Sequence, residues 1–264
     1  MSYETISLLF TVSVVVNLAF LIAVRNYRRK LARIKTRNRF EKLGGGTIPV
    51  RSVYDVFLQI KRTDLGPAAS TRVVHIANDH TPGGITDFES WILCNLSKSA
   101  QRIFEFGTAT GKTSFLLAAN SPPECEVITV TLGPGQHGDY QHDHGDIRSD
   151  SDVAISESRF TRFVYTGTQQ EAKIQQLFSD SKQLRLEQYQ GQVDLVFIDG
   201  SHARSYVEND TRLAMRLLRP GGVIVWHDYR GAETVPGVFE TLNSMANKIK
   251  LTHLAGTSMV VYQG

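Results

Sequence analysis

The sequence is poor in cysteine, with only Cys94 and Cys125 among its 264 residues. Two thiols are too few for a disulfide scaffold and do not have the spacing of a metal site, so both of these classes are excluded. We expect buried thiols in a reducing compartment. With 41% hydrophobic and 21% charged residues, the chain has the composition of an ordinary globular protein, which excludes disorder for most of its length.

Net charge is also small, at +3, and it is unevenly distributed along the chain. Residues 1–43 contain nine lysines and arginines against two acidic residues, a local charge of +7 that leaves −4 on the remainder. A protein that binds the phosphate backbone needs a basic surface on its folded body. We therefore expect no nucleic acid partner.

A single long apolar run lies near the N-terminus. Residues 6–24 carry no charged side chain, and a helix of that length, rising about 1.5 Å per residue, is long enough to cross a hydrocarbon layer of ~30 Å. A cleaved signal peptide would have basic residues before the run, whereas here Arg25, Arg28 and Arg29 follow it. The pattern predicts a signal anchor, and thus a single-pass membrane protein whose folded domain is cytoplasmic.

Three parts follow from this reading. We expect an N-terminal tail with a transmembrane helix (residues 1–24), a basic juxtamembrane stalk ending in a glycine hinge (25–46) and a folded domain (47–264). Within the third part, short apolar runs alternate with segments of helical periodicity, which predicts an α/β fold with a Rossmann-like, doubly wound, mostly parallel sheet. We also expect a helix near 53–61, a polar loop over 133–158, and strands near 163–165, 173–178, 250–256 and 258–263.

The turn after the strand at 102–106 has the spacing Glu-x-Gly-x-x-x-Gly, from Glu105 through Gly107 to Gly111. It is one residue too short for the loop that holds a nucleoside triphosphate, so a kinase or nucleotide hydrolase is disfavoured. The same spacing is typical of the turn on which class I S-adenosylmethionine (SAM) methyltransferases bind the amino-acid end of the cofactor. A tight turn with a purely structural role would need the same glycines.

Acidic and imidazole side chains follow two neighbouring buried strands. Asp199 and His202 come after the strand at 193–198, and His227 and Asp228 end the strand at 222–229. Because the carboxyl ends of parallel strands line one crevice, these four side chains are expected to meet there. His202 and His227 are candidate bases, since imidazole titrates near neutral pH, although any one of the four is equally suited to capping a loop.

Four segments resemble the class I SAM-dependent methyltransferases, and among them methyltransferase family 24. They are EFGTATGKTSFLLAAN, KIQQLFSDS, VDLVFIDGSHARSYVENDTRLAMRLLRPGGVIVWHDY and HLAGTSMVVY, and the resemblance spans residues 84–264. It implies a seven-stranded sheet with an antiparallel C-terminal strand and SAM bound across the first four strand ends. The implied contacts to the methionine and ribose of SAM are Glu105, Gly107, Thr108 and Gly111. Asp180 and Ser181 would hold the adenine, and Asp199 would lie beside the methionine end or a metal ion.

One position departs from the family pattern. The family usually has an acidic residue at the end of the second strand, where it holds both ribose hydroxyls, and here that cofactor-binding position is Thr131. A hydroxyl replaces two charge-assisted hydrogen bonds with one neutral bond, so the affinity for SAM is expected to fall by roughly 1–3 kcal/mol. This substitution keeps open a second class of function, a membrane-tethered binding or scaffold protein with a degenerate, non-catalytic methyltransferase fold.

A divalent cation is the second possible cofactor. Related magnesium-dependent O-methyltransferases take ligands from the same two strand ends, where Asp199 and Asp228 match and Tyr229 stands in place of an amide ligand. The loop with His137, His142 and His144 is expected to be a substrate lid, with a metal site as the alternative.

The leading hypothesis is a membrane-anchored SAM-dependent methyltransferase that modifies a hydroxyl of a small-molecule, glycan or lipid-linked acceptor; the oligomeric state stays open.

Overall fold

The computed structural model describes residues 20–25, 27–28 and 46–264, and it divides the chain into two units, Met1–Lys42 and Leu43–Gly264. Most of the predicted anchor (6–24) and of the predicted stalk (25–46) lies outside the described residues. Within the described part of the chain, no helix has both the length and the apolar character needed to span a membrane. The second unit is described below.

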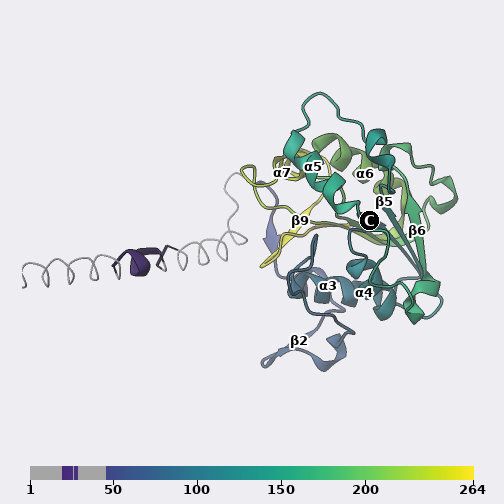
Figure 1. Cartoon of the computed structure of the whole chain (residues 1–264). Helices are drawn as coiled ribbons and strands as arrows, with labels where there is room; N and C mark the ends of the chain where they lie inside the picture. Colours follow the sequence, from purple (N-terminus) through teal and green to yellow (C-terminus); the bar gives the residue numbers. More distant parts are fainter. Residues whose placement is uncertain (1–19, 26, 29–45) are drawn as a thin grey trace, which may run out of the picture. The chain divides into compact units, whose positions relative to one another are not determined.

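An eight-stranded sheet forms the centre of the second unit (Figure 1). Its order is β1-β9-β10-β8-β7-β4-β5-β6, and the strands are β1 (Val50–Arg51), β4 (Arg102–Phe106), β5 (Glu126–Thr131), β6 (Ile174–Phe178), β7 (Val193–Ile198), β8 (Leu218–Trp226), β9 (Thr252–Leu254) and β10 (Val260–Gln263). The five strands from β6 to β8 are parallel, and β10 runs antiparallel to both of its neighbours. The predicted mostly parallel, Rossmann-like sheet with an antiparallel C-terminal strand is confirmed.

The expected number of strands, seven, is wrong by one. The additional strand is β1, which pairs in parallel with β9 through Val50 opposite His253 and Arg51 opposite Leu254. A strand of two residues is too short to show an alternating apolar pattern in the sequence. It is recognised only by its pairing with β9. A separate hairpin, β2 (Arg62–Thr63) with β3 (Gly66–Pro67), lies outside the main sheet.

Helices cover both faces of the sheet, α3 and α4 on one face and α5, α6 and α7 on the other (Figure 1). The α-helices are α2 (Val53–Val56), α3 (Asp87–Ser97), α4 (Lys112–Asn120), α5 (Arg148–Glu157), α6 (Arg204–Leu217) and α7 (Pro236–Met245). Short 3-10 helices are η1 (Ala69–Thr71), η2 (Gln136–Asp139), η3 (Gln169–Lys173), η4 (Ser181–Gln183) and η5 (Glu187–Tyr189).

Strand β7 shows why these apolar runs are continuous. Val196 and Ile198 pack into the core beneath α6 and α7, whereas Leu195 and Phe197 pack into the core beneath α3 and α4. Successive side chains of a strand point to opposite faces, so a strand covered on both sides needs apolar residues at every position. After Asp194 near the start of this strand, the next polar residue is Asp199, which follows β7 directly at the carboxyl edge of the sheet.

Three local expectations are corrected by the structure. The predicted loop over 133–158 contains α5, a helix with polar residues along most of its length. No strand forms at 163–165, because Thr166 and Thr168 bond back to Phe163 and Tyr165 in consecutive turns. The helix expected near 53–61 ends at Val56, since the next residue has an extended backbone.

Candidate functional site

The turn between β4 and α4 needs glycine at two positions for reasons of packing. Gly107 has a φ of 96°, and an added Cβ would lie 2.0 Å from the carbonyl oxygen of Asp199. Gly111 has a φ of 73°, and its Cβ would lie 2.7 Å from the ring of Tyr165. Any side chain at Gly107 would thus separate this turn from the end of β7. Gly107 thus allows the ends of β4 and β7 to approach at one edge of the sheet, and Gly111 allows the turn to pack against Tyr165.

Glu105 and Thr108 lie beneath this turn. The buried Glu105 carboxyl accepts hydrogen bonds from the hydroxyls of Thr129, at 2.6 Å, and Ser114. Burial raises the pKa of Glu105 to about 7, against the opposing effect of these two bonds. The hydroxyl of Thr108 shares a 2.8 Å hydrogen bond with that of Thr129. The hydrogen bonds of Glu105 and Thr108 link the β4–α4 turn to Thr129 and Ser114. The predicted contacts of Glu105 and Thr108 with SAM stay predictions.

A pocket opens beside the turn, at the carboxyl ends of β4, β5 and β7. It encloses about 510 Å³, part of which is open to solvent. Five of the predicted cofactor-binding residues line it, namely Gly107, Thr131, Asp180, Ser181 and Asp199. Further lining residues that the sequence did not reveal include Tyr140, Ala154, Glu157, Tyr206 and Asp210. Apolar and aromatic walls with a few polar groups at one end are typical of a small-molecule site.

Stacked tyrosines and buried carboxyls build the far end of the pocket. The rings of Tyr140 and Tyr206 stack with their centroids 4.4 Å apart. The hydroxyl of Tyr206 donates to Asp180 over 3.0 Å, and the backbone N–H of Lys182 donates to the same side chain over 3.0 Å. Asp210 reaches the pocket from α6, and burial raises the pKa of its carboxyl to about 7. The sequence analysis did not identify Asp210, because a single acidic residue in a helix does not indicate whether its side chain points to solvent or into a pocket.

His227 lies at the centre of a buried charge cluster next to this pocket. Its Nδ1 lies 2.8 Å from Asp199 Oδ1 and 3.3 Å from Asp228 Oδ1, and its Nε2 lies 3.4 Å from Glu89 Oε2. Burial acts to lower the pKa of His227, but the charges of Asp199 and Asp228 outweigh it and raise this pKa well above its ordinary value. With 4% of its surface exposed, His227 is a buried imidazolium. It is a poor candidate for a base.

Glu89 of α3 was not among the predicted site residues. It forms a capping box with Thr86, and it accepts hydrogen bonds from the backbone N–H and hydroxyl of Ser258, at 2.6 and 2.8 Å. Burial acts to raise its pKa, but the bonds and charge of His227 outweigh this effect and lower it. The Thr-x-x-Glu spacing signals the capping box, but the contact with His227 depends on the tertiary fold.

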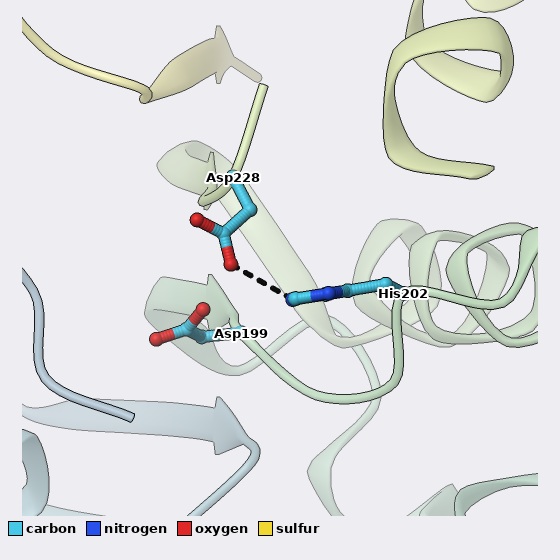
Figure 2. A group of neighbouring side chains, drawn as sticks. All are labelled: Asp199, His202 and Asp228. Carbon is cyan, nitrogen blue, oxygen red and sulfur yellow. Dashed lines mark ion pairs between the residues drawn. The ribbon is translucent and has the colours of Figure 1, made fainter. Parts of the chain in front are cut away.

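His202 differs from His227 in being partly open. Its Nε2 lies 2.8 Å from Asp228 Oδ2, and its side chain is 18% exposed (Figure 2). Burial acts to lower the pKa of His202, but the hydrogen bond and charge of Asp228 outweigh it and raise this pKa. Asp228 has a φ of 59°, an uncommon backbone conformation outside glycine, and it also pairs with Arg230 at 2.6 Å. Arg230 was missed by the sequence analysis.

Asp199, His202 and Asp228 are the described group that offers ligand atoms to a metal ion, with one atom from each within 4.8 Å of the others (Figure 2). The carboxylates already have cationic partners, however: His227 on Asp199, and His202 and Arg230 on Asp228. Tyr229, the third position in the prediction, is buried and donates to Asn243. Because further positive charge would meet repulsion here, the donor set fits a divalent cation poorly.

The loop histidines lie apart from this group. Among the described residues, no metal-binding group includes His137, His142 or His144. His142 lies edge-on to the ring of Tyr140 and 3.2 Å from the hydroxyl of Ser151. This segment therefore contacts the pocket wall through Tyr140, and its predicted role as a substrate lid stays a prediction.

Comparison with known proteins gives a family match for the part of the chain that builds the site. Residues 104–229 match methyltransferase family 24, described as a methyltransferase domain. No curated protein matches the sequence.

Solved structures to which this chain is similar include three methyltransferases. The O-methyltransferase TomG from Streptomyces achromogenes, in complex with SAM, is 19% identical, with a TM-score of 0.46 over 67% of this chain and 79% of that one. A Bacillus cereus O-methyltransferase in complex with S-adenosylhomocysteine (SAH) is 18% identical, with a TM-score of 0.43 over 73% and 84%. The SAH-bound methyltransferase PaMTH1 from Podospora anserina is 15% identical, with a TM-score of 0.46 over 68% and 78%.

Proposed function

Since this chain carries a SAM-dependent methyltransferase domain that resembles methyltransferase family 24, we propose that it is a membrane-anchored O-methyltransferase. Its acceptor is a hydroxyl of a small-molecule, glycan or lipid-linked compound. The observation that carries the proposal is the partly open His202, paired with Asp228 at the carboxyl end of the sheet, beside a pocket lined by Asp199.

The proposed chemistry divides between the cofactor and two side chains. SAM supplies a methyl group on a positively charged sulfur, so the protein has to align the acceptor and remove its proton. Asp228 holds Nε2 of His202, which leaves Nδ1 of the same ring as the proton-accepting atom. Asp228 also stabilises the imidazolium that forms when His202 takes the proton.

We assign no metal ion to this reaction. His227 and Arg230 already provide positive charge next to Asp199 and Asp228, at 2.8 and 2.6 Å respectively. The buried imidazolium of His227 keeps Asp199 ionised and fixes its carboxylate at the edge of the pocket. Methyl transfer is therefore expected to proceed in the presence of EDTA.

The membrane part of the proposal depends on the sequence pattern. An uncharged run over 6–24 followed by a basic flank supports a single-pass anchor with the domain in the cytoplasm. A domain held at a membrane meets lipid-linked acceptors at high local concentration, which is why this acceptor class is included.

The test is transfer of tritium from methyl-labelled SAM to a mixture of total lipid and soluble metabolites, with EDTA present. His202→Gln is expected to reduce transfer by about 10²–10⁴-fold, the usual contribution of a general base, while leaving SAM affinity within about twofold. His137→Gln, a change at an exposed histidine of the loop, is the matched control and retains full transfer. Full activity in the His202 variant would rule out this residue as the base.

A further inference from the structure

Four carboxyl side chains line the pocket, and three of them have partners. Asp180 accepts from Tyr206, Asp199 pairs with His227, and Asp210 accepts from Asn209 at 3.0 Å. The fourth, Glu157, forms no hydrogen bond or ion pair with any residue in the described part of the chain. It is thus the pocket carboxylate that is available to a ligand.

Glu157 is placed against the β4–α4 turn by the last turn of α5. An ideal Cβ on Gly83 would lie 3.1 Å from Glu157 Oε1 and 3.0 Å from the Cβ of Ala109, so these three residues converge. Ala109 belongs to the turn and lines the same pocket, and its φ of 41° is an unusual left-handed conformation. The free carboxylate therefore faces the backbone segment on which the resemblance places the cofactor.

The charges around Glu157 do not offset the effect of its burial. Burial raises the pKa of Glu157 to about 7, and the negative charges of Asp199 and Asp228 act in the same direction, while His202 and His227 act against it. A partly buried carboxyl that lacks hydrogen-bond donors is unfavourable in the free protein. A ligand that brings donors to this point would regain that energy.

Thr131 lines the same pocket at the end of β5, where a carboxylate would be expected to hold the cofactor. We propose that Glu157 is a cofactor-binding residue that supplies, from α5, the carboxylate that the end of β5 lacks. This inference rests on the proposed function, because it assumes that SAM occupies the pocket. The chemistry recognised is a hydrogen-bond donor of the cofactor, either the ribose hydroxyls or the α-ammonium group.

The test is isothermal titration of SAH into the full-length protein in detergent. Glu157→Gln is expected to weaken SAH binding by about tenfold to a hundredfold, the usual effect of losing charge-assisted hydrogen bonds. Asp152→Asn is the matched control, since Asp152 is exposed on the same helix and does not line the pocket, and it retains wild-type affinity. An affinity within twofold of wild type in Glu157→Gln overturns the inference.

A second ligand identifies the donor. 5′-Methylthioadenosine keeps the ribose but lacks the amino-acid group. If the Glu157 carboxylate holds the ribose, Glu157→Gln therefore weakens the binding of 5′-methylthioadenosine as well as that of SAH. If 5′-methylthioadenosine binds both proteins equally while SAH is weakened, Glu157 holds the ammonium group. Either result supports a cofactor-binding role.

Two further outcomes separate the inference from the function on which it rests. If wild-type protein binds neither ligand at millimolar concentration, the proposed function fails and the inference fails with it. If wild-type protein binds SAH and Glu157→Gln does not fold, Glu157→Asp decides the question, because it keeps the charge but withdraws the carboxylate by one methylene. Reduced affinity in Glu157→Asp supports the inference, and unchanged affinity overturns it.

Discussion

His202 and His227 lie at the ends of neighbouring strands, but different surroundings suit them to different tasks. His227 is enclosed by Asp199, Asp228 and Glu89 and is held as a cation. His202 has one carboxylate partner and an open side. A base has to lose its proton near neutral pH and to reach the substrate, and His202 meets both conditions better.

The Asp228→Asn variant tests how this pair titrates. Catalysis requires neutral His202, so activity should rise with pH through the pKa of His202, which Asp228 raises. Removing the negative charge lowers that pKa, and the acid limb of the rate profile therefore moves to lower pH while the maximal rate falls. Initial rates between pH 5 and 9 measure both effects. An acid limb at the same pH in both proteins would mean that His202 is not the titrating group.

Glu89→Gln tests the buried ion cluster through stability. The raised pKa of His227 contributes stability that is complete below about pH 6.5, its pKa in the unfolded chain, and is lost as pH rises through the folded pKa. Glu89, whose pKa is lowered, contributes stability above about pH 4 that is lost as pH falls.

Removing Glu89 breaks a buried pair, for which a loss of about 3–5 kcal/mol is typical. The Glu89→Gln variant holds the proton on His227 less tightly than the wild type does. Its loss of stability relative to the wild type should therefore be larger at pH 6 than at pH 9. Thermal unfolding at the two pH values measures this difference. Equal deficits at both would show that Glu89 acts through its capping box and Ser258 alone.

At the scale of elements, the β4–α4 turn is the part of the site that the sequence predicts best. Its glycine spacing reflects the backbone conformation of a tight turn, which depends on residues that are neighbours in sequence. In the structure, Gly107 lies in close contact with the backbone of Asp199. The acids and imidazoles at the ends of β7 and β8 were found for a similar reason, since each follows an apolar run. Their roles toward cofactor and acceptor remain predictions.

Gly107→Ala should separate the two strand ends. An added methyl would lie 2.0 Å from the Asp199 carbonyl oxygen at a φ that disfavours alanine, so the turn has to move. We expect SAH binding to weaken by more than about a hundredfold and stability to fall by roughly 1–3 kcal/mol. Gly138→Ala, where an added Cβ meets no atom within 4 Å, is the control for calorimetry and unfolding. Wild-type affinity in Gly107→Ala would refute the close approach.

Helix α5 shows where sequence reasoning ended. Its residues are mostly polar, and its N-cap, Ile147, provides no side-chain capping bond, so neither periodicity nor a start signal marked it. Asp150 and Ser151 are nevertheless buried, and Ala154 and Glu157 line the pocket at the strand ends. Such burial depends on tertiary contacts, and for this reason Glu157 was not predicted.

For the whole molecule, the central parallel strands β4, β5, β7 and β8 were predictable because buried strands leave apolar runs in the sequence. The eighth strand, β1, could not be predicted, because its two residues are defined as a strand only by their pairing with β9. Glu89 shows the same limit for the site, because two of the three residues that its side chain contacts are distant in sequence: Ser258 is 169 positions away and His227 is 138 positions away.

The proposed anchor is a prediction for the complete chain. The uncharged run over 6–24 should keep full-length protein in the membrane pellet after carbonate extraction, and a variant lacking residues 1–24 should appear in the supernatant. Added protease should digest the domain in inside-out vesicles and spare it in intact cells. Release of the full-length chain by carbonate would refute the anchor while leaving the domain's chemistry untouched.

The central claim is that this domain binds SAM as its methyl donor despite Thr131 at the end of β5. Isothermal titration of SAM into the full-length protein measures it most directly. One molecule of SAM per chain, bound with a dissociation constant in the micromolar range, is the predicted result. No heat of binding at millimolar SAM would contradict the account and would favour a membrane-tethered scaffold with a degenerate methyltransferase fold.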